Sequence, residues 1–163
     1  LVKVWKMICD SDQNNWKLLI AGDGKEFDNI NNLVIENGLN DKIQLLGRLS
    51  NEEVFKFMRK SKIYALSSYS EAFPFVALEA MQNKLPIVSF DVRTGPRNIV
   101  IDGKTGFLVT DGHLEEYASK IKLLMNTPEL LQQMSKAAAE HSENFLKDNI
   151  MKKWYALIDN SNI

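Results

Sequence analysis

The sequence predicts an α/β fold in which helices cover both faces of a parallel sheet. Short apolar stretches rich in β-branched residues alternate with amphipathic stretches from residue 17 to residue 109, and this alternation is typical of parallel sheets. From residue 114 onward only helical patterns follow, which predicts a helical C-terminal tail. A chain of 163 residues can bury a substantial core, so we treat residues 1–163 as one domain.

Helix caps define the elements of the first half. Gly38 is a suitable C-terminal cap, and Ser50 with Glu53 forms a capping box at the start of another helix. Gly22 and Gly24 mark the turn after the first strand. The expected elements are helices over residues 1–8, 27–37 and 51–59 and strands over residues 17–21 and 43–46.

Prolines mark helix starts in the second half. Pro74 and Pro128 each suit the first helical turn, where the missing N–H costs nothing. The last helix carries an apolar stripe of Trp154, Tyr155 and Ile158. The expected elements are strands over residues 63–67, 86–90 and 106–109 and helices over residues 76–82, 114–125, 128–143 and 146–158.

Two carboxylates stand eight positions apart around the helix that begins near Pro74. Glu71 follows a predicted strand, and Glu79 lies on the helix. Ligands of parallel sheets bind at the carboxyl ends of strands, where helix N-termini offer free N–H groups. Donors for phosphate and carboxylates for hydroxyls suit a sugar nucleotide. Acidic residues are also common near helix N-termini for electrostatic reasons, and on spacing alone this explanation is the more frequent one.

The context of these carboxylates favours the functional interpretation. The motifs occur in a fixed order along nearly the whole chain and closely resemble the donor-binding domain of family 4 glycosyltransferases, which are retaining enzymes of the GT-B architecture. The resemblance implies a Rossmann-like sheet, the C-terminal half of a GT-B enzyme, and a nucleotide-sugar donor-binding domain over residues 1–163. The motifs that carry it are the segments 18–24, 43–47, 70–81, 85–89, 94–96 and 102–109.

The resemblance assigns roles to both carboxylates. It implies that Glu79 binds the ribose of the nucleotide, since two carboxylate oxygens suit two adjacent hydroxyls. It places Glu71 beside the transferred sugar as the catalytic carboxylate. It also implies that Phe73, Phe75 and Val76 offer backbone N–H groups to the donor. Many relatives have Gly-Phe-Gly where this chain has Phe-Pro-Phe, and for Phe75 a plain core position is equally frequent.

Further donor-binding candidates follow other strands. Arg48 and Leu49 are expected to line the nucleobase pocket, although a solvated arginine is as frequent. Gly22 and Gly24 allow close approach of the backbone to a ligand, and a tight turn is the default explanation. Thr94 and Gly95 enter a short helix near the same edge. Asn98 is a departure from the family pattern, because relatives with this Thr-Gly-Pro form usually carry glutamate there. Arg93 is the nearest available cation for a diphosphate.

The resemblance also implies sequence that this chain does not contain. A strand with a Gly-Arg element and a following Lys-Gly element is expected before Leu1, and an acceptor-binding domain before that. We therefore expect a donor domain that is incomplete at its N-terminus. We expect the missing domain to bind the glycan acceptor, and this chain alone to be catalytically inactive.

Bulk properties exclude several other classes. The net charge of −1 and the pI near 6.2 give no basic field for nucleic acid. The single cysteine, Cys9, fits a reducing compartment, and no apolar run is long enough to span a bilayer. We expect a cytoplasmic domain, with its parent protein at the inner face of the cytoplasmic membrane. His113 and His141 lack metal-ligand spacing, so we expect no metal and no cofactor, the nucleotide sugar being a substrate.

Three functions compete at this point. The first is sugar transfer from a UDP-sugar to a glycan or lipid-linked acceptor in surface polysaccharide synthesis. The second is a non-catalytic nucleotide-sugar-binding module, which Asn98 favours and the intact Glu71 and Glu79 oppose. The third is a GT-B sugar-nucleotide epimerase, which shares the architecture but has different local motifs.

Overall fold

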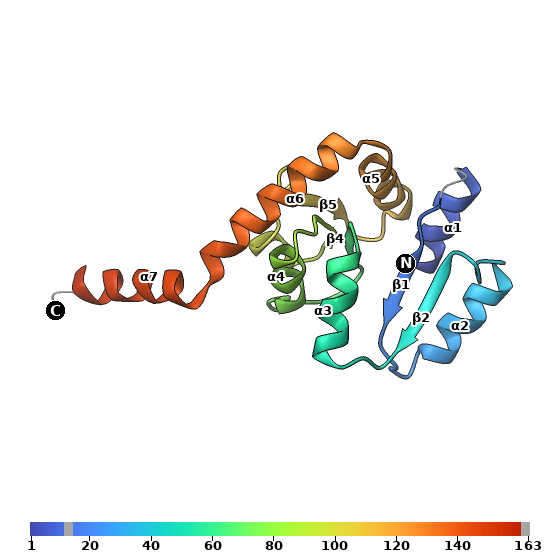
Figure 1. The fold of residues 1–163 in the computed structure, drawn as a ribbon, viewed down its shortest axis with the longest axis horizontal. Coiled ribbons are helices and arrows are strands. Elements are labelled where there is room, and N and C mark those ends of the chain that lie inside the picture. Colours follow the sequence, from blue (N-terminus) through green and yellow to red (C-terminus); the bar gives the residue numbers. More distant parts are fainter. Residues whose placement is uncertain (12–14, 161–163) are drawn as a thin grey trace.

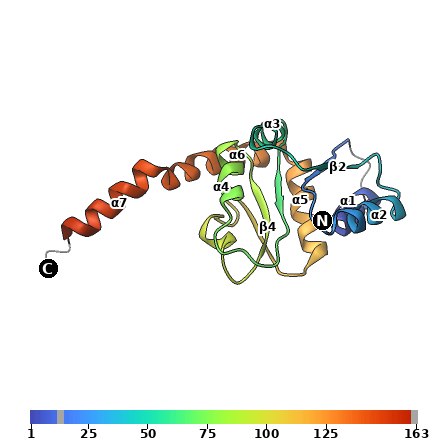
Figure 2. The ribbon, with the colours of Figure 1, turned by 90° about the horizontal axis from the view of Figure 1, so that it is seen from below.

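The computed structural model describes residues 1–11 and 15–160, and it has the alternating order of helices and strands expected from the sequence. The long helix α7 projects away from the body that the other elements form (Figures 1 and 2). The strands are β1 (Leu18–Ala21), β2 (Ile43–Gly47), β3 (Tyr64–Leu66), β4 (Ile87–Asp91) and β5 (Gly106–Thr110). The α-helices are α1 (Val2–Ser11), α2 (Phe27–Glu36), α3 (Asn51–Lys60), α4 (Phe75–Gln82), α5 (Leu114–Asn126), α6 (Pro128–Ser142) and α7 (Lys147–Asn160), with 3₁₀ helices η1 (Pro96–Asn98) and η2 (Glu143–Phe145).

The strands pair in parallel, as predicted, but they form two sheets. One sheet has the order β1-β2, and the other has the order β3-β4-β5. Within the larger sheet, Ile87 of β4 lies opposite Tyr64 of β3 and Gly106 of β5. The α/β fold with parallel strands is therefore confirmed, and β1 and β3 are both edge strands in the described part of the chain.

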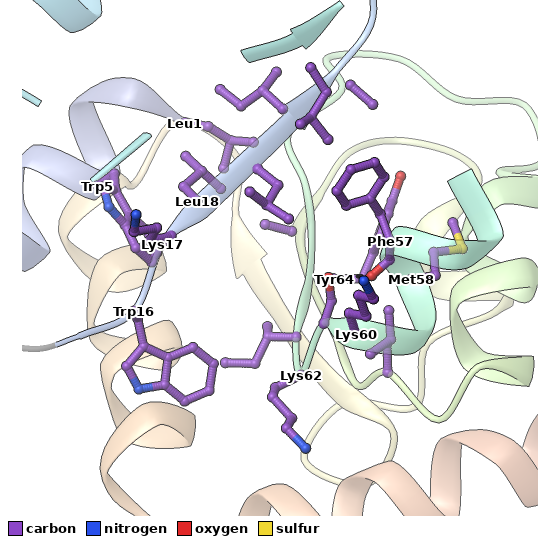
Figure 3. Close-up of a pocket in the computed structure, with 18 of the residues that line it drawn as sticks. Leu1, Trp5, Trp16, Lys17, Leu18, Phe57, Met58, Lys60, Lys62 and Tyr64 are labelled. Atoms are coloured by element: carbon purple, nitrogen blue, oxygen red, sulfur yellow. Dashed lines mark hydrogen bonds between the residues drawn. The ribbon is translucent and has the colours of Figure 1, made fainter. Parts of the chain in front are cut away.

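A cleft of about 850 Å³ separates β1 from β3 (Figure 3). Figure 3 shows Trp16, before β1, and Lys62, before β3, at the same end of this cleft. The Leu18 N–H donates to the Lys42 carbonyl on the side of β2, and successive N–H groups of a strand point to opposite sides, so the Leu19 N–H faces the cleft. Trp5 also lines this cleft, and its buried Nε1 has no hydrogen-bond partner in the described residues. This cleft is where the strand expected before Leu1 would pair, and that strand stays a prediction.

Helices cover both faces of the larger sheet. Ile87 of β4 packs in a cluster with residues of α4 and α6, whereas Val88 and Phe90 pack in a second cluster with residues of α1 and α5. The Tyr117 hydroxyl on α5 lies 2.5 Å from the Val88 carbonyl and 3.2 Å from the Leu66 carbonyl. Burial raises the pKa of Tyr117, so this hydroxyl stays a donor that joins α5 to β3 and β4.

Local capping signals are confirmed at several boundaries. Ser50 accepts from the Glu53 N–H, and Glu53 accepts from the Ser50 N–H, which completes the predicted capping box of α3. Gly38 follows α2 with a φ of 64°, and Pro128 is the first residue of α6. In the described residues no helix is long and apolar enough to cross a membrane.

Candidate functional site

The carboxyl ends of the strands carry the candidate residues. Because the strands of each sheet are parallel, the loops that follow them lie at one edge of that sheet. Gly22 and Gly24 follow β1, and Arg48 and Leu49 follow β2. The loop after β3 carries Glu71, and the loop after β4 carries Thr94 and Gly95. The structure brings these residues together in two groups, one at the end of each sheet.

The group at the end of the smaller sheet is joined by backbone and side-chain contacts. The Gly22 N–H donates to the Gly47 carbonyl at 2.7 Å, and Arg48 Nε lies 3.0 Å from Asp23 Oδ2. The Arg48 side chain is 82% exposed, so it is a solvated residue in an ion pair. Asp23, the partner of Arg48, lies in the Gly22–Gly24 turn and was not among the predicted site residues. A cavity of about 170 Å³ beside Gly22 and Gly24 is smaller than most ligand pockets.

The group at the end of the larger sheet joins the loops after β3 and β4. Thr94 Oγ1 donates to the Glu71 carbonyl oxygen at 2.8 Å. Gly95 is buried and has a φ of 97°, and a Cβ at this position would lie 2.6 Å from the Glu71 carbonyl oxygen. Thr94 and Gly95, which the sequence analysis treated as donor-binding residues, thus contact the backbone of Glu71 directly.

Helix α4 begins one residue before the expected range of residues 76–82, and Pro74 lies just outside its first turn. Pro74 is the N-cap and Phe75 the first helical residue. The Phe75 N–H, expected to meet the donor, points to the Phe73 carbonyl at 3.0 Å. The Phe75 side chain is 70% exposed, which corrects the alternative of a core position, and its ring packs edge to face against Phe73. Val76 is half-buried, and its side chain lines the cleft between the sheets, as does that of Leu49.

Tyr64 was not among the predicted site residues, but the charges of both motif carboxylates affect its pKa. Burial, and to a smaller extent the negative charges of Glu79 and Glu71, together raise the pKa of Tyr64 to about 12. All three side chains are half-buried. The one signal for Tyr64 in the sequence is its place in the strand directly before the motif. Its phenol therefore keeps its proton at neutral pH beside two carboxylates.

A bidentate ion pair stabilises the turn after β4. Arg97 Nε lies 2.8 Å from Asp91 Oδ1, and Arg97 Nη2 lies 2.6 Å from Asp91 Oδ2. The Asp91 hydrogen bond and charge raise the pKa of the Arg97 guanidinium. Arg93, the cation expected nearest a diphosphate, is exposed. Among residues 1–11 and 15–160, no group of three or more histidine, cysteine and acidic side chains could hold a metal ion.

Comparison with known proteins gives a consistent family. The model of the family described as "Glycosyl transferases group 1" matches residues 1–141. An uncharacterized glycosyltransferase of Haemophilus influenzae is 33% identical over 158 residues, which cover 97% of this chain and 44% of that protein. An exopolysaccharide phosphotransferase of Streptomyces coelicolor is 37% identical over 146 residues, which cover 90% of this chain and 15% of that protein.

A solved structure supports the same grouping. A TarM mutant of Staphylococcus aureus, in complex with fondaparinux, α-GlcNAc-glycerol and UDP, superposes with a TM-score of 0.84 at 28% identity. The match covers 96% of this chain and 31% of that one. The chain thus spans less than half the length of each of these relatives.

Proposed function

Because this chain belongs to the group 1 glycosyl transferases, we propose that it binds the nucleotide-sugar donor of a retaining hexosyltransferase, with a UDP-sugar as the donor. The TarM structure contains UDP, and the Streptomyces relative is named for exopolysaccharide. The first supports a UDP-sugar as donor, and the second supports a role in surface polysaccharide synthesis, in which a glycan or a lipid-linked glycan accepts the sugar. The acceptor would bind the rest of the full-length protein.

The observation that carries this proposal is the placement of two carboxylates around the start of α4. Glu71 precedes the helix in the loop after β3, and Glu79 lies on the helix itself. Both carboxylates are half-buried, and the charge of each contributes, after burial, to the raised pKa of Tyr64. A helix N-terminus between two carboxylates offers N–H groups to phosphate and oxygen acceptors to sugar hydroxyls.

The proposed chemistry follows from these residues. Glu79 accepts hydrogen bonds from the ribose hydroxyls, which fixes the nucleotide. Glu71 accepts from hydroxyls of the transferred sugar and stabilises positive charge that develops at the anomeric carbon. The bond from that carbon to the phosphate oxygen breaks and UDP leaves with the electron pair, while the acceptor oxygen bonds to the carbon and its hydroxyl proton passes to the leaving phosphate. Helix N-termini and cations offset the charge of the leaving group, so the proposal includes no metal and no cofactor.

The setting of the reaction is part of the proposal. The near-neutral net charge gives no reason to expect nucleic acid as a partner. A single cysteine suits the reducing cytoplasm, and we place the full-length protein at the inner face of the cytoplasmic membrane.

A matched pair of variants in the full-length protein tests the proposal. Glu71→Gln should retain UDP affinity and lose most of the release of UDP from UDP-GlcNAc or UDP-glucose. Glu79→Gln should weaken UDP binding by about tenfold or more, because a hydrogen bond to a charged group is lost. Wild-type protein that binds UDP-sugar but never releases UDP, with or without polysaccharide acceptors, would support a non-catalytic binding module instead. Wild-type protein that binds neither ligand would refute both.

A further inference from the structure

We propose that Thr94 and Gly95 are positioning residues that set the place of Glu71, and that they do not themselves bind the donor. This inference rests on the proposed function, because it assigns these residues to the Glu71 side of the same site. It changes their role from the direct contact suggested by the sequence to an indirect one.

The loop that carries Glu71 has little other support. The hydrogen bond from Thr94 Oγ1 to the Glu71 carbonyl joins residues 23 positions apart. Within the described residues, positions 68–72 make no other hydrogen bond. Because this loop has a single hydrogen bond to the rest of the structure, we infer that the Thr94 hydroxyl determines where the Glu71 backbone lies.

Gly95 makes this close approach possible. A Cβ on Gly95 would lie 2.6 Å from the Glu71 carbonyl oxygen and 2.9 Å from the Glu71 Cβ. These distances are shorter than van der Waals contact, so any larger residue would displace the Glu71 loop. The φ of 97° adds a second requirement for glycine, since side chains rarely adopt this backbone conformation.

The segment that presents Thr94 and Gly95 is itself well anchored. The Asn98 N–H donates to the Gly95 carbonyl at 3.0 Å, and Arg97 binds the Asp91 carboxylate through two nitrogens. Ile99 is 1% exposed, which fixes the end of the turn in the core. Because the turn is well anchored and the loop has few hydrogen bonds, the turn determines the position of the loop.

The carboxylate of Glu71 depends on this positioning. In the described part of the chain, no hydrogen bond to the Glu71 carboxylate is formed, so its direction follows from its backbone. The position of Glu79 is set separately, because Glu79 belongs to α4. Loss of the Thr94 contact should therefore affect the sugar end of the donor and spare the nucleotide end.

Thr94→Val in the full-length protein tests this division, since valine keeps the shape and loses the hydroxyl. Calorimetry measures the affinities for UDP, UDP-GlcNAc and UDP-glucose, and UDP release from the two sugar nucleotides gives kcat and KM. We expect kcat to fall by about three- to tenfold, as for one lost hydrogen bond, and UDP affinity to stay within about twofold. Thr94→Ser, which keeps the hydroxyl, should restore kcat.

Thr127→Val is the matched control. Thr127 lies at the end of α5, which starts after the carboxyl end of β5 and ends at the opposite edge of the sheet, and its side chain makes no capping hydrogen bond. The Thr127→Val substitution should leave the nucleotide affinities, kcat and KM unchanged. The proposal is overturned if Thr94→Val weakens UDP and UDP-sugar binding equally, if it leaves kcat unchanged, or if Thr94→Ser fails to restore kcat. Failure of the proposed function is a different result, because wild-type protein would then bind neither UDP nor its sugars.

Discussion

Alkaline pH should destabilise this domain through Tyr64. Its pKa in the folded state is about 12, above the ordinary value of 10, because burial and the charges of Glu79 and Glu71 disfavour the phenolate. The folded state thus holds the Tyr64 proton more tightly than the unfolded state. This stabilisation is fully present below pH 10 and is lost as the pH rises through 12. The difference between the two values corresponds to about 3 kcal/mol of unfolding free energy.

Urea unfolding of wild type and Tyr64→Phe at pH values on both sides of this window measures the effect. The loss of stability between pH 10 and pH 12 should be about 3 kcal/mol smaller in Tyr64→Phe. Tyr69→Phe is the matched control, because the Tyr69 side chain is 88% exposed, and it should follow wild type. Equal losses in wild type and Tyr64→Phe would refute the raised pKa of Tyr64, and with it the burial that is its largest cause.

Three further predictions concern stability. Gly106→Ala should prevent stable folding, because its Cβ would lie 1.9 Å from the Ile87 carbonyl oxygen and disrupt the pairing of β4 with β5. Gly112→Ala is the control: with open space around its Cβ, it should lower the free energy of unfolding in denaturant by about 1 kcal/mol. Ser50→Ala should lower the unfolding free energy by about 1 kcal/mol. Because Ser50 lowers the pKa of Glu53, the wild-type advantage should shrink as the pH falls through the Glu53 titration. If a strand before α1 fills the cleft between β1 and β3, extending the chain at its N-terminus should raise the melting temperature and change Trp5 fluorescence. An unchanged melting temperature and unchanged fluorescence would argue against that strand.

Much of the fold could be predicted because its signals are local. The capping box of Ser50 and Glu53, the glycine after α2 and Pro128 each act within one helical turn, so short segments of sequence are sufficient to place these boundaries. The alternation of apolar segments correctly predicted parallel strands. The family assignment, which rested on the order of motifs, is confirmed by the match over residues 1–141.

The rest depends on contacts between distant segments. The hydrogen bond between Thr94 and Glu71 spans 23 positions, and no periodicity reports such a contact. The sequence correctly indicates that Tyr64 is a strand residue, but it does not indicate that the charge of Glu79 affects the pKa of Tyr64. Phe75 has an apolar side chain of the kind usually found in a core, but its position in the first turn of α4 exposes it. The division into two sheets follows from a cleft whose walls, β1 and β3, lie more than forty positions apart. The roles of the candidate site residues stay predictions.

The central claim is that Glu79 binds the ribose of a uridine nucleotide. Calorimetric titration of the full-length protein with UDP, UDP-GlcNAc and GDP, in wild type and Glu79→Gln, tests it most directly. Glu129→Gln is the control, because Glu129 is exposed in the first turn of α6, next to Thr127 at the opposite edge of the sheet. The account predicts saturable UDP binding that Glu79→Gln weakens by about tenfold or more and that Glu129→Gln leaves unchanged. UDP affinity that is equal in wild type and Glu79→Gln, or a folded wild-type protein that binds no uridine nucleotide, would contradict it.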